Sequence, residues 1–369
     1  MSKAAELAAL IGSGQAQGNK NLVQNGSMAV SQRATSSTGL GAASGYFTLD
    51  RFIMSINSAS AGRYTMSQSD VTDLEGFSNA LKIQCTTADT SIAAGEVLIL
   101  SQRIEGQNIQ TLKSNSTSSK AFTISFYAKS NESRAISLEA RFSNGTNRQA
   151  ATVHTIGTSW ARYTMTVAAA SSIQIDNDNS NEMQINFFLH AGSDFSSGTI
   201  QGSTLGAADN TKRAAGIGSI FASTDNFIEI TGLQMEVGEV ATPFEHEDIG
   251  TTLAKCQRYF ENVEWNGYVV FGNSYTTTQW LLQQIIWKVE KRVAPTLTYP
   301  TIGTSSNEIG ITDDTANYVT QGSTIRGFIT TTGAAAYNNN ADGYSGLTDD
   351  SICSLYSNGA TTLKVDAEL

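Results

Sequence analysis

The sequence predicts an all-β protein, for three reasons. Segment after segment alternates apolar and polar residues as half-buried strands do, for example Phe122 to Ala128 and Ala135 to Phe142. Turn residues separate these segments, with Asn144-Gly145 directly after the second one. Charged residues make up only 15% of the chain, below the roughly 25% of an average soluble protein, so hydroxyl and amide side chains cover much of its surface.

Composition also excludes two classes of function. The formal net charge is −10, so the field around the molecule repels nucleic-acid backbones. No apolar run reaches the ~18 residues of a membrane-spanning helix, so we expect no membrane insertion. The N-terminus lacks the basic and apolar regions of a signal peptide, which predicts synthesis in a cytoplasm.

The first segment, Ala4 to Ile11, consists of strong helix formers and is stopped by Gly12. A helix this short is unstable alone in water, so it needs a partner. Residues 1–20 are therefore predicted to form a helical anchoring or assembly segment, with a frayed terminal tail as the alternative.

A β-sandwich is expected from residue 21 to residue 247. The strand series continues with Trp160 to Val167, Met183 to Leu189 and Phe227 to Met235. Gly192 to Gly218 is rich in glycine, serine and alanine without periodicity, which predicts a long exposed loop. The pattern breaks around Pro243, which marks the expected domain boundary.

A second, smaller β-domain is expected from residue 248 to residue 369. It opens with a helix from Thr251 to Asn262 that has one apolar face and a capping threonine or aspartate before it. Strand patterns then follow at residues 267–271, 280–289, 295–299, 324–330, 351–357 and 361–365. The fold class is thus all-β, with a short N-terminal helix and one further helix before the second sandwich.

No motif indicates catalysis. The GxSxG pattern is absent, and the three histidines lie far apart without metal-ligand spacing. Cys85, Cys256 and Cys353 are isolated, which predicts buried free thiols. Paired carboxylates can cleave a glycan, but the acidic residues of this chain fit solvated turns better. We therefore expect a protein that is not an enzyme and holds no cofactor.

Asp176 and Asp178 are the one candidate pair for a metal. Their segment, Asp-Asn-Asp-Asn, has the oxygen density of a calcium loop but not the spacing of an EF-hand. A polar turn is the preferred interpretation, and a structural calcium is the alternative.

Several segments together resemble a known family. Asn21 to Met28, followed by Val30 to Arg33, is similar to the opening of many phage tail-fibre proteins and to the first strand of carbohydrate-binding-module jelly rolls. Tyr46 to Phe52 matches the aromatic-Asp-Arg-aromatic element of the same class. The most specific match is Gly232 to Gly238, which runs into Ala241-Thr242-Pro243-Phe244-Glu245 and then Leu253 to Glu261.

The resemblance implies a phage tail-fibre or receptor-binding protein with a carbohydrate-binding-module-like jelly roll and a distal C-terminal β-domain. It implies a homotrimer in the virion that attaches through its N-terminus to other tail or virion proteins and recognises a host-surface polysaccharide without catalysis. The alternatives are a capsid (head) fibre or decoration protein and a glycan-depolymerising tailspike. The long strand repeat of a parallel β-helix, typical of such spikes, is missing.

Aromatic rings decide where a sugar can bind, because a ring face stacks on a pyranose while amides and carboxylates bind its hydroxyls. Trp160, Trp280 and Trp287 fall within strand patterns and are predicted to be core residues. Trp265 falls at a predicted turn and is a binding candidate. The other candidates share one loop, with a hairpin tip of no function as the alternative: Tyr337, Asn338, Asn339, Asn340, Asp342 and Tyr344.

Trimerisation is the first testable expectation. The short N-terminal helix needs partners, and the resemblance implies three chains. Light scattering of the full chain should return about three times the chain mass of 39.3 kDa. A stable monomer at micromolar concentration would contradict it.

Overall fold

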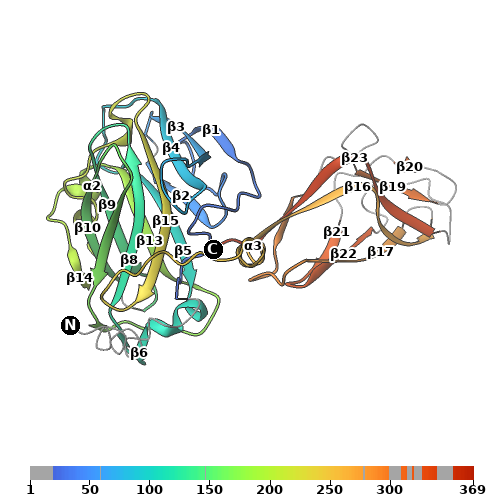
Figure 1. Cartoon of the computed structure of the whole chain (residues 1–369). Coiled ribbons are helices and arrows are strands. Elements are labelled where there is room, and N and C mark those ends of the chain that lie inside the picture. Colours follow the sequence, from blue (N-terminus) through green and yellow to red (C-terminus); the bar gives the residue numbers. More distant parts are fainter. Residues whose placement is uncertain are drawn as a thin grey trace. The chain divides into compact units, whose positions relative to one another are not determined.

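The computed structural model describes residues 20–58, 60–145, 147–276, 279–298, 309–313, 318–319, 326–338 and 352–369. The predicted N-terminal helix lies outside these residues. The chain forms two compact units, Met1–Thr252 with Leu369, and Leu253–Glu368. The all-β prediction is confirmed: both units are built from antiparallel sheets (Figure 1).

Two six-stranded sheets form the first unit. The first, sheet A, has the order β1-β3-β4-β15-β8-β11. Its strands are β1 (Ser36–Leu40), β3 (Arg63–Asp70), β4 (Asn79–Thr87), β15 (Phe227–Val237), β8 (Phe122–Ser130) and β11 (Ala161–Val167). The second, sheet B, has the order β14-β10-β9-β13-β5-β2. Its strands are β14 (Gly202–Ala207), β10 (Arg148–Ile156), β9 (Arg134–Phe142), β13 (Asn181–Ala191), β5 (Val97–Glu105) and β2 (Phe52–Asn57).

The core lies between these sheets and follows the alternation of the sequence. In β8, Phe122, Ile124 and Phe126 are fully buried apolar residues, while Tyr127 and Lys129 point to the other side of sheet A. Phe126 meets Phe187 of β13 edge-on, at 5.0 Å between ring centroids. At one end of the unit lie the 3₁₀-helix η1 (Gly106–Leu112) and a small sheet of β6 (Lys113–Asn115), β7 (Ser118–Ser119) and β12 (Ala170–Ser171).

The N-terminal motif serves the fold, because its polar side chains bond to the backbone. Asn21 accepts from the amide of Met235 at 3.1 Å and donates to the carbonyl of Leu233 at 3.2 Å. Asn25 is buried and bonds to both backbone groups of Val30, at 2.9 Å each. The Asn21 bonds tie the chain before the first strand to the bulged part of β15, and the Asn25 bonds close the turn that follows.

The aromatic-Asp-Arg-aromatic motif is also structural. Asp50 is fully buried and accepts from the amide of Gln32 at 3.0 Å. Arg51 is 1% exposed and donates to Gln24 at 2.9 Å and to the carbonyl of Arg103 at 2.7 Å. A buried charge is tolerated only when it is hydrogen-bonded in this way.

A buried polar clamp closes the first unit. The Glu236 carboxylate accepts two hydrogen bonds from Thr242, one from the Thr242 hydroxyl at 2.6 Å and one from the Thr242 backbone amide at 2.9 Å. The amide of Glu245 donates to Gln234 at 2.8 Å, and Glu245 itself accepts from the amide of Asn21 at 2.8 Å. The clamp therefore fixes the segment around Pro243 to the end of β15 and to the first described residues.

The prediction of a long exposed loop from Gly192 to Gly218 is wrong. This stretch contains the one-turn helix α2 (Ser193–Ser196), strand β14 and the 3₁₀-helix η2 (Asn210–Lys212). Phe195 and Ala214 are buried and pack with Val97, Ile99 and Phe188 on the outer face of sheet B. The apolar residues of this segment show no period because only isolated side chains, such as Phe195 and Ala214, pack on the sheet. The 3₁₀-helix η3 (Ile220–Ala222) follows it.

In the second unit the strands join into one eight-stranded sheet, in the order β20-β19-β23-β16-β17-β22-β21 with β18 beside β23. Figure 1 shows β16 and β23 above β21 and β22, so the sheet forms two layers. The strands are β16 (Phe260–Thr276), β17 (Gln279–Ile286), β18 (Thr296–Thr298), β19 (Ile309–Asp313), β20 (Tyr318–Val319), β21 (Arg326–Ile329), β22 (Gly333–Asn338) and β23 (Ile352–Asp366). The two strands predicted at residues 351–357 and 361–365 are one strand, because the register shift against β16 absorbs the glycine between them.

Helix α3 (Ile249–Gln257) is confirmed, although it ends before the expected Asn262 because Phe260 already begins β16. Asp248 caps it by accepting from the amides of Gly250 at 2.9 Å and Thr251 at 3.2 Å. The three cysteines are buried and free, as predicted. Among the described residues, no helix combines the length and apolarity needed to cross a bilayer.

Gly26, in the N-terminal motif, lies so close to the backbone of β15 that a larger residue should destabilise the fold. A β-carbon there would lie 2.1 Å from the carbonyl oxygen of Leu233, which is backbone and cannot rotate away. Gly26→Ala should therefore lower the free energy of unfolding by about 1–3 kcal/mol or more, measured by chemical denaturation. Gly157→Ala is the control, because no atom lies within 4 Å of its added carbon. Equal stability of the two variants would contradict the proposed close approach.

Candidate functional site

The predicted aromatic loop lies mostly outside the described part of the chain. Tyr337 and Asn338 end β22, where the structure describes their backbone only. Asn339, Asn340, Asp342 and Tyr344 lie outside the described residues. This loop therefore stays a prediction.

The placement of Trp265 at an exposed turn is wrong. Trp265 lies within β16, in register with Thr361 of β23, and is only 3% exposed. Asn266-Gly267 forms a register shift in a continuous strand rather than a turn, because the partner strand continues alongside. A buried ring cannot stack on a sugar in this unit.

Asp176 and Asp178 lie in a polar turn, each bonded locally. Asp178 accepts from the amide of Ser180 at 3.0 Å. Asp176 accepts from Gln174 at 3.0 Å and from Asn144 at 2.7 Å, and these bonds lower the pKa of its carboxyl. Within the described ranges, no cluster of three acidic, histidine or cysteine side chains could hold a metal ion.

Asn144 also brings Asp176 beside a second carboxylate, Glu182, to which it donates at 2.9 Å. Burial raises the pKa of Glu182, so the environments of these two acids differ in the sense found in glycosidases. Glu182 is fully buried, however, and a substrate cannot reach it.

Trp160 is not a core residue, contrary to the prediction. It precedes β11 and lies half-buried on the outer face of sheet A. Its indole Nε1 donates to Asp73 at 2.8 Å, and the Lys129 ammonium lies 4.9 Å from its ring centroid. Lys129 also pairs with Asp73 at 3.0 Å and with Glu229 at 3.4 Å.

Further rings continue this surface. Phe77 lies 5.2 Å from the ring of Tyr127, 5.1 Å from that of Phe244 and 5.2 Å from that of His246. Gly232 makes this approach possible, because a β-carbon there would lie 2.8 Å from both Phe77 and Tyr127. We call the set the aromatic surface: Phe77, Tyr127, Trp160, Phe244 and His246, with Asp73, Lys129 and Glu229 as its charged groups.

The charges of the aromatic surface are set by its contacts. Hydrogen bonds from Lys129 and Trp160 lower the pKa of Asp73. Burial alone would lower the pKa of Lys129, but bonds and charges from Asp73 and Glu229 outweigh it and raise that pKa. Both groups are therefore charged at neutral pH.

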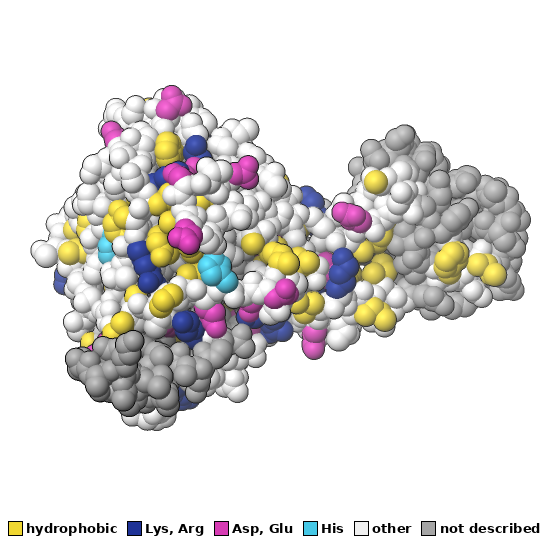
Figure 2. All heavy atoms as spheres, in the orientation of Figure 1, with side chains coloured by type: hydrophobic (Ala, Val, Ile, Leu, Met, Phe, Trp, Pro, Cys, Tyr) yellow, Lys and Arg dark blue, Asp and Glu magenta, His cyan; other side chains and the backbone are white. Residues whose placement is uncertain are grey.

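This arrangement suits a neutral or weakly charged polar ligand with one apolar face. Partly exposed rings offer a stacking platform, and the ionised groups beside them offer hydrogen bonds. Figure 2 shows hydrophobic, acidic, basic and histidine side chains intermingled on the visible face of the first unit. A sugar has the required combination of an apolar ring face and hydroxyl groups.

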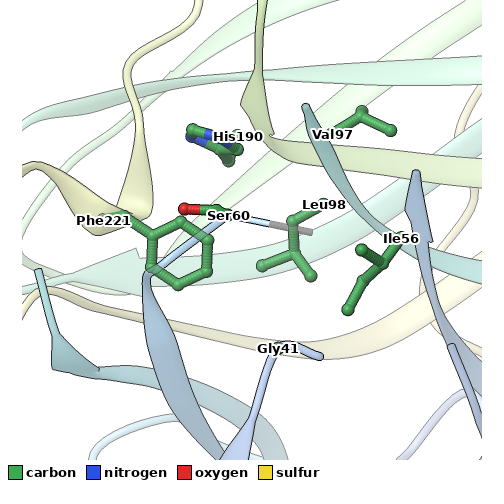
Figure 3. A pocket seen from close by; sticks show the side chains of 7 residues that line it. All are labelled: Gly41, Ile56, Ser60, Val97, Leu98, His190 and Phe221. Atoms are coloured by element: carbon green, nitrogen blue, oxygen red, sulfur yellow. The ribbon is translucent and has the colours of Figure 1, made fainter. Parts of the chain in front are cut away.

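A small cavity in the first unit is too small to hold a ligand (Figure 3). Its lining residues are mostly apolar: Gly41, Ile56, Ser60, Val97, Leu98, His190 and Phe221. Its volume of about 10 Å³ holds at most a single water molecule. The cavity is therefore a packing gap and not a ligand site.

The aromatic surface was missed in the sequence for an identifiable reason. Trp160 begins a strand pattern, and the pattern alone does not say on which face its ring lies. Lys129 and Tyr127 alternate with the core residues of β8, so their outward direction was predictable. Their meeting with Asp73 and Phe77, from a loop fifty residues earlier, was not.

Comparisons with known proteins give no family. No family model matches the sequence, and no curated protein matches it. Among solved structures, the chain is similar to the enzymatically active domain of tailspike protein 4 of Bacteriophage CBA120, at 12% identity and a TM-score of 0.32. The match covers 59% of this chain and 22% of that one, so it spans well under half of the tailspike.

Two further structures show comparable similarity. A family 11 carbohydrate-binding module from Clostridium thermocellum, in complex with a β-1,3-1,4-mixed-linked tetrasaccharide, is 11% identical with a TM-score of 0.27 over 57% of this chain and 99% of that one. An exo-β-agarase is 12% identical with a TM-score of 0.28 over 81% of this chain and 40% of that one. At TM-scores of this size, none of these similarities transfers a ligand or an activity to this chain.

His190 gives a prediction about pH. Its imidazole is 1% exposed, bonded to Ser219 at 2.7 Å and to Glu96 at 3.2 Å. Burial lowers its pKa below the ordinary 6.5, against the opposing effect of Glu96 and Asp89. The unfolded chain therefore binds more protons below pH 6.5, and stability present above that pH should be lost as the pH falls.

Chemical denaturation between pH 5 and pH 8 tests this. The parent should lose free energy of unfolding below pH 6.5, by up to about 1.4 kcal/mol for each unit by which the folded pKa lies below the unfolded one. His190→Gln should reduce that dependence, and part of it should remain because burial also lowers the pKa of His154. Parallel curves for the parent and His190→Gln would show that His190 does not set the slope.

Proposed function

We propose that the chain is a non-catalytic glycan-binding protein of a phage-type virion appendage. The observation that carries this is the aromatic surface: half-buried Trp160 and Tyr127 beside Asp73 and Lys129, held on a rigid six-stranded sheet. A binding surface on a sheet is positioned by the core beneath it and costs little ordering when a ligand binds. The virion role rests on the sequence motifs and not on this geometry.

The wider assignment follows the same motifs. We propose a homotrimer that joins other tail or virion proteins through its N-terminal segment, in a phage tail fibre made in the host cytoplasm. Three copies would present three aromatic surfaces, so weak single-site affinity becomes avid binding to a repeating surface polysaccharide. A capsid fibre or decoration protein with the same units remains the alternative within this class.

One observation favours an enzyme as the second candidate. Asp176 and Glu182 share Asn144 and have carboxyl pKa values moved in opposite directions. The burial of Glu182 argues against it. Incubation with host polysaccharide and measurement of reducing ends decides the matter: release that is lost in Glu182→Gln would establish a depolymerase, and no release supports a binding protein.

The aromatic surface is tested on a glycan array, followed by binding to host polysaccharide. Trp160→Ala should weaken binding, because one stacking ring contributes about 0.5–1.5 kcal/mol beyond its buried area. Repetition over three chains should enlarge the loss. Trp160→Phe retains a ring but loses the bond to Asp73, so its loss should be smaller.

The loop predicted in the C-terminal domain is the alternative binding site, and a second variant tests it. Tyr337→Ala with Tyr344→Ala removes both rings of that loop. Thermal unfolding should show that every variant remains folded. If the double tyrosine variant loses binding and Trp160→Ala does not, the contact lies in the loop and the aromatic surface is not the site.

A further inference from the structure

The outer face of sheet B carries a row of long polar side chains across four strands. Arg141 of β9 pairs in register with Gln184 of β13 on one side and with Gln149 of β10 on the other. Gln184 in turn pairs with Arg103 of β5. Side chains opposite one another in an antiparallel sheet share a face, with β-carbons about 5 Å apart. We call these four residues the Arg141 row.

Arg141 has no hydrogen-bond or ion-pair partner among the described residues. It is half-buried, and Glu139, the acid whose charge acts on it, is already bonded to other side chains. Both oxygens of Glu139 bind Arg213, at 2.7 and 2.8 Å, and one also accepts from Asn186 at 2.7 Å. The Glu139 carboxylate is therefore already paired with Arg213, and among the described residues Arg141 has no carboxylate of its own.

The electrostatics of Arg141 are correspondingly unfavourable. Burial lowers the pKa of its guanidinium, and the charge of Arg213 lowers it further, while Glu139 opposes both. A partly desolvated cation next to another cation gains from an anion that fits its planar fork.

The two glutamines beside Arg141 differ in exposure. Gln149 is fully buried, and its Oε1 has no hydrogen-bond partner in the described structure, although its Nε2 donates to the carbonyl of Asp209 at 2.8 Å. A buried amide oxygen without a partner is costly, and nearly all such atoms in folded proteins find one. The amide of Gln184 is also unbonded and remains partly exposed.

We propose that the Arg141 row binds an acidic sugar unit, with the sugar carboxylate on Arg141 and a hydroxyl on Gln184, the two members of the row that are partly exposed and unbonded among the described residues. The inference rests on the proposed glycan-binding function and adds to it a second site, on sheet B rather than on the aromatic surface of sheet A, for polysaccharides that contain hexuronate. The strands of the row span roughly 14 Å, which suits an extended saccharide better than a single inorganic anion. Arg103 closes one end of the row, donating to the carbonyl of Leu369.

The net charge of the protein indicates how an acidic saccharide would have to be bound. With a charge of −10, the molecule repels polyanions at long range, so general attraction to acidic polymers cannot produce binding. An acidic saccharide must be held by local contacts. Added salt should accordingly weaken its binding less than it weakens binding to a basic patch.

The test titrates the full chain with trigalacturonate and with glucuronate, by isothermal titration calorimetry. Their neutral counterparts, galactotriose and glucose, and acetate serve as comparison ligands. We expect saturable binding of at least one hexuronate at low millimolar concentration or better. Arg141→Gln should weaken it at least tenfold, about 1.4 kcal/mol. Arg141→Lys should lose less, because it keeps the charge without the fork.

Gln184→Ala provides a second variant, should Arg141→Gln fail to fold, and should weaken binding severalfold. Arg63→Gln is the control: it removes the same charge from sheet A, where Arg63 bonds only to the nearby carbonyls of Ser60 and Gly62.

Three outcomes overturn the inference: no saturable hexuronate binding in the parent, unchanged binding in folded Arg141 and Gln184 variants, or equal binding of acetate. If the glycan array shows binding to neutral glycans only, the proposed function survives and the Arg141 row is not an acidic-sugar site. If no glycan binds at all, the proposed function itself fails.

Discussion

The pairing of buried polar groups at the C-terminal end of β15 is the constraint on which the first unit depends. Gln234 and Glu236 are almost fully buried, and neither could remain so without Thr242 and Glu245 as partners. These bonds bring the segment around Pro243 back onto the strand that precedes it. Asn21 joins the same network, so both ends of the first unit meet at one strand. Removal of one member would leave the others buried and unpaired, which costs more than the bond itself.

The clamp also builds the aromatic surface. Because Thr242 and Glu245 are fixed, Phe244 between them is held against Phe77, and Phe77 in turn lies against Tyr127 over Gly232. The short segment from Thr242 to Glu245 therefore both stabilises the first unit and positions Phe244 in the aromatic surface. Sheet B differs, because the Gly192 to Gly218 segment covers part of its outer face through Phe195, Ala214 and Arg213. Asp209 of that segment also covers Gln149, whereas Arg141 and Gln184 stay partly exposed.

The family-like motifs explain why the sequence indicates a fold more clearly than a ligand. Asn21, Asn25, Asp50 and Arg51 all bond to the backbone or to each other's neighbours inside the unit. Their residue types are required by hydrogen-bond geometry and by close approaches such as that at Gly26. Residues that can meet a ligand, such as Trp160 and Arg141, lie outside these motifs, where the fold leaves the side chain less restricted.

The sequence by itself determined the fold class, most strands of the first unit and the helix at the boundary, since period-two alternation, turn residues and a capping aspartate are local signals. It did not determine which residues of those strands face a ligand. Trp160 falls within a strand pattern and Trp265 at a predicted turn, yet Trp160 is half-buried on a sheet face and Trp265 is covered. Likewise, the meeting of Arg141, Gln149 and Gln184 depends on the register of three strands. Burial and register arise from contacts between distant segments, and only the tertiary structure brings those segments together.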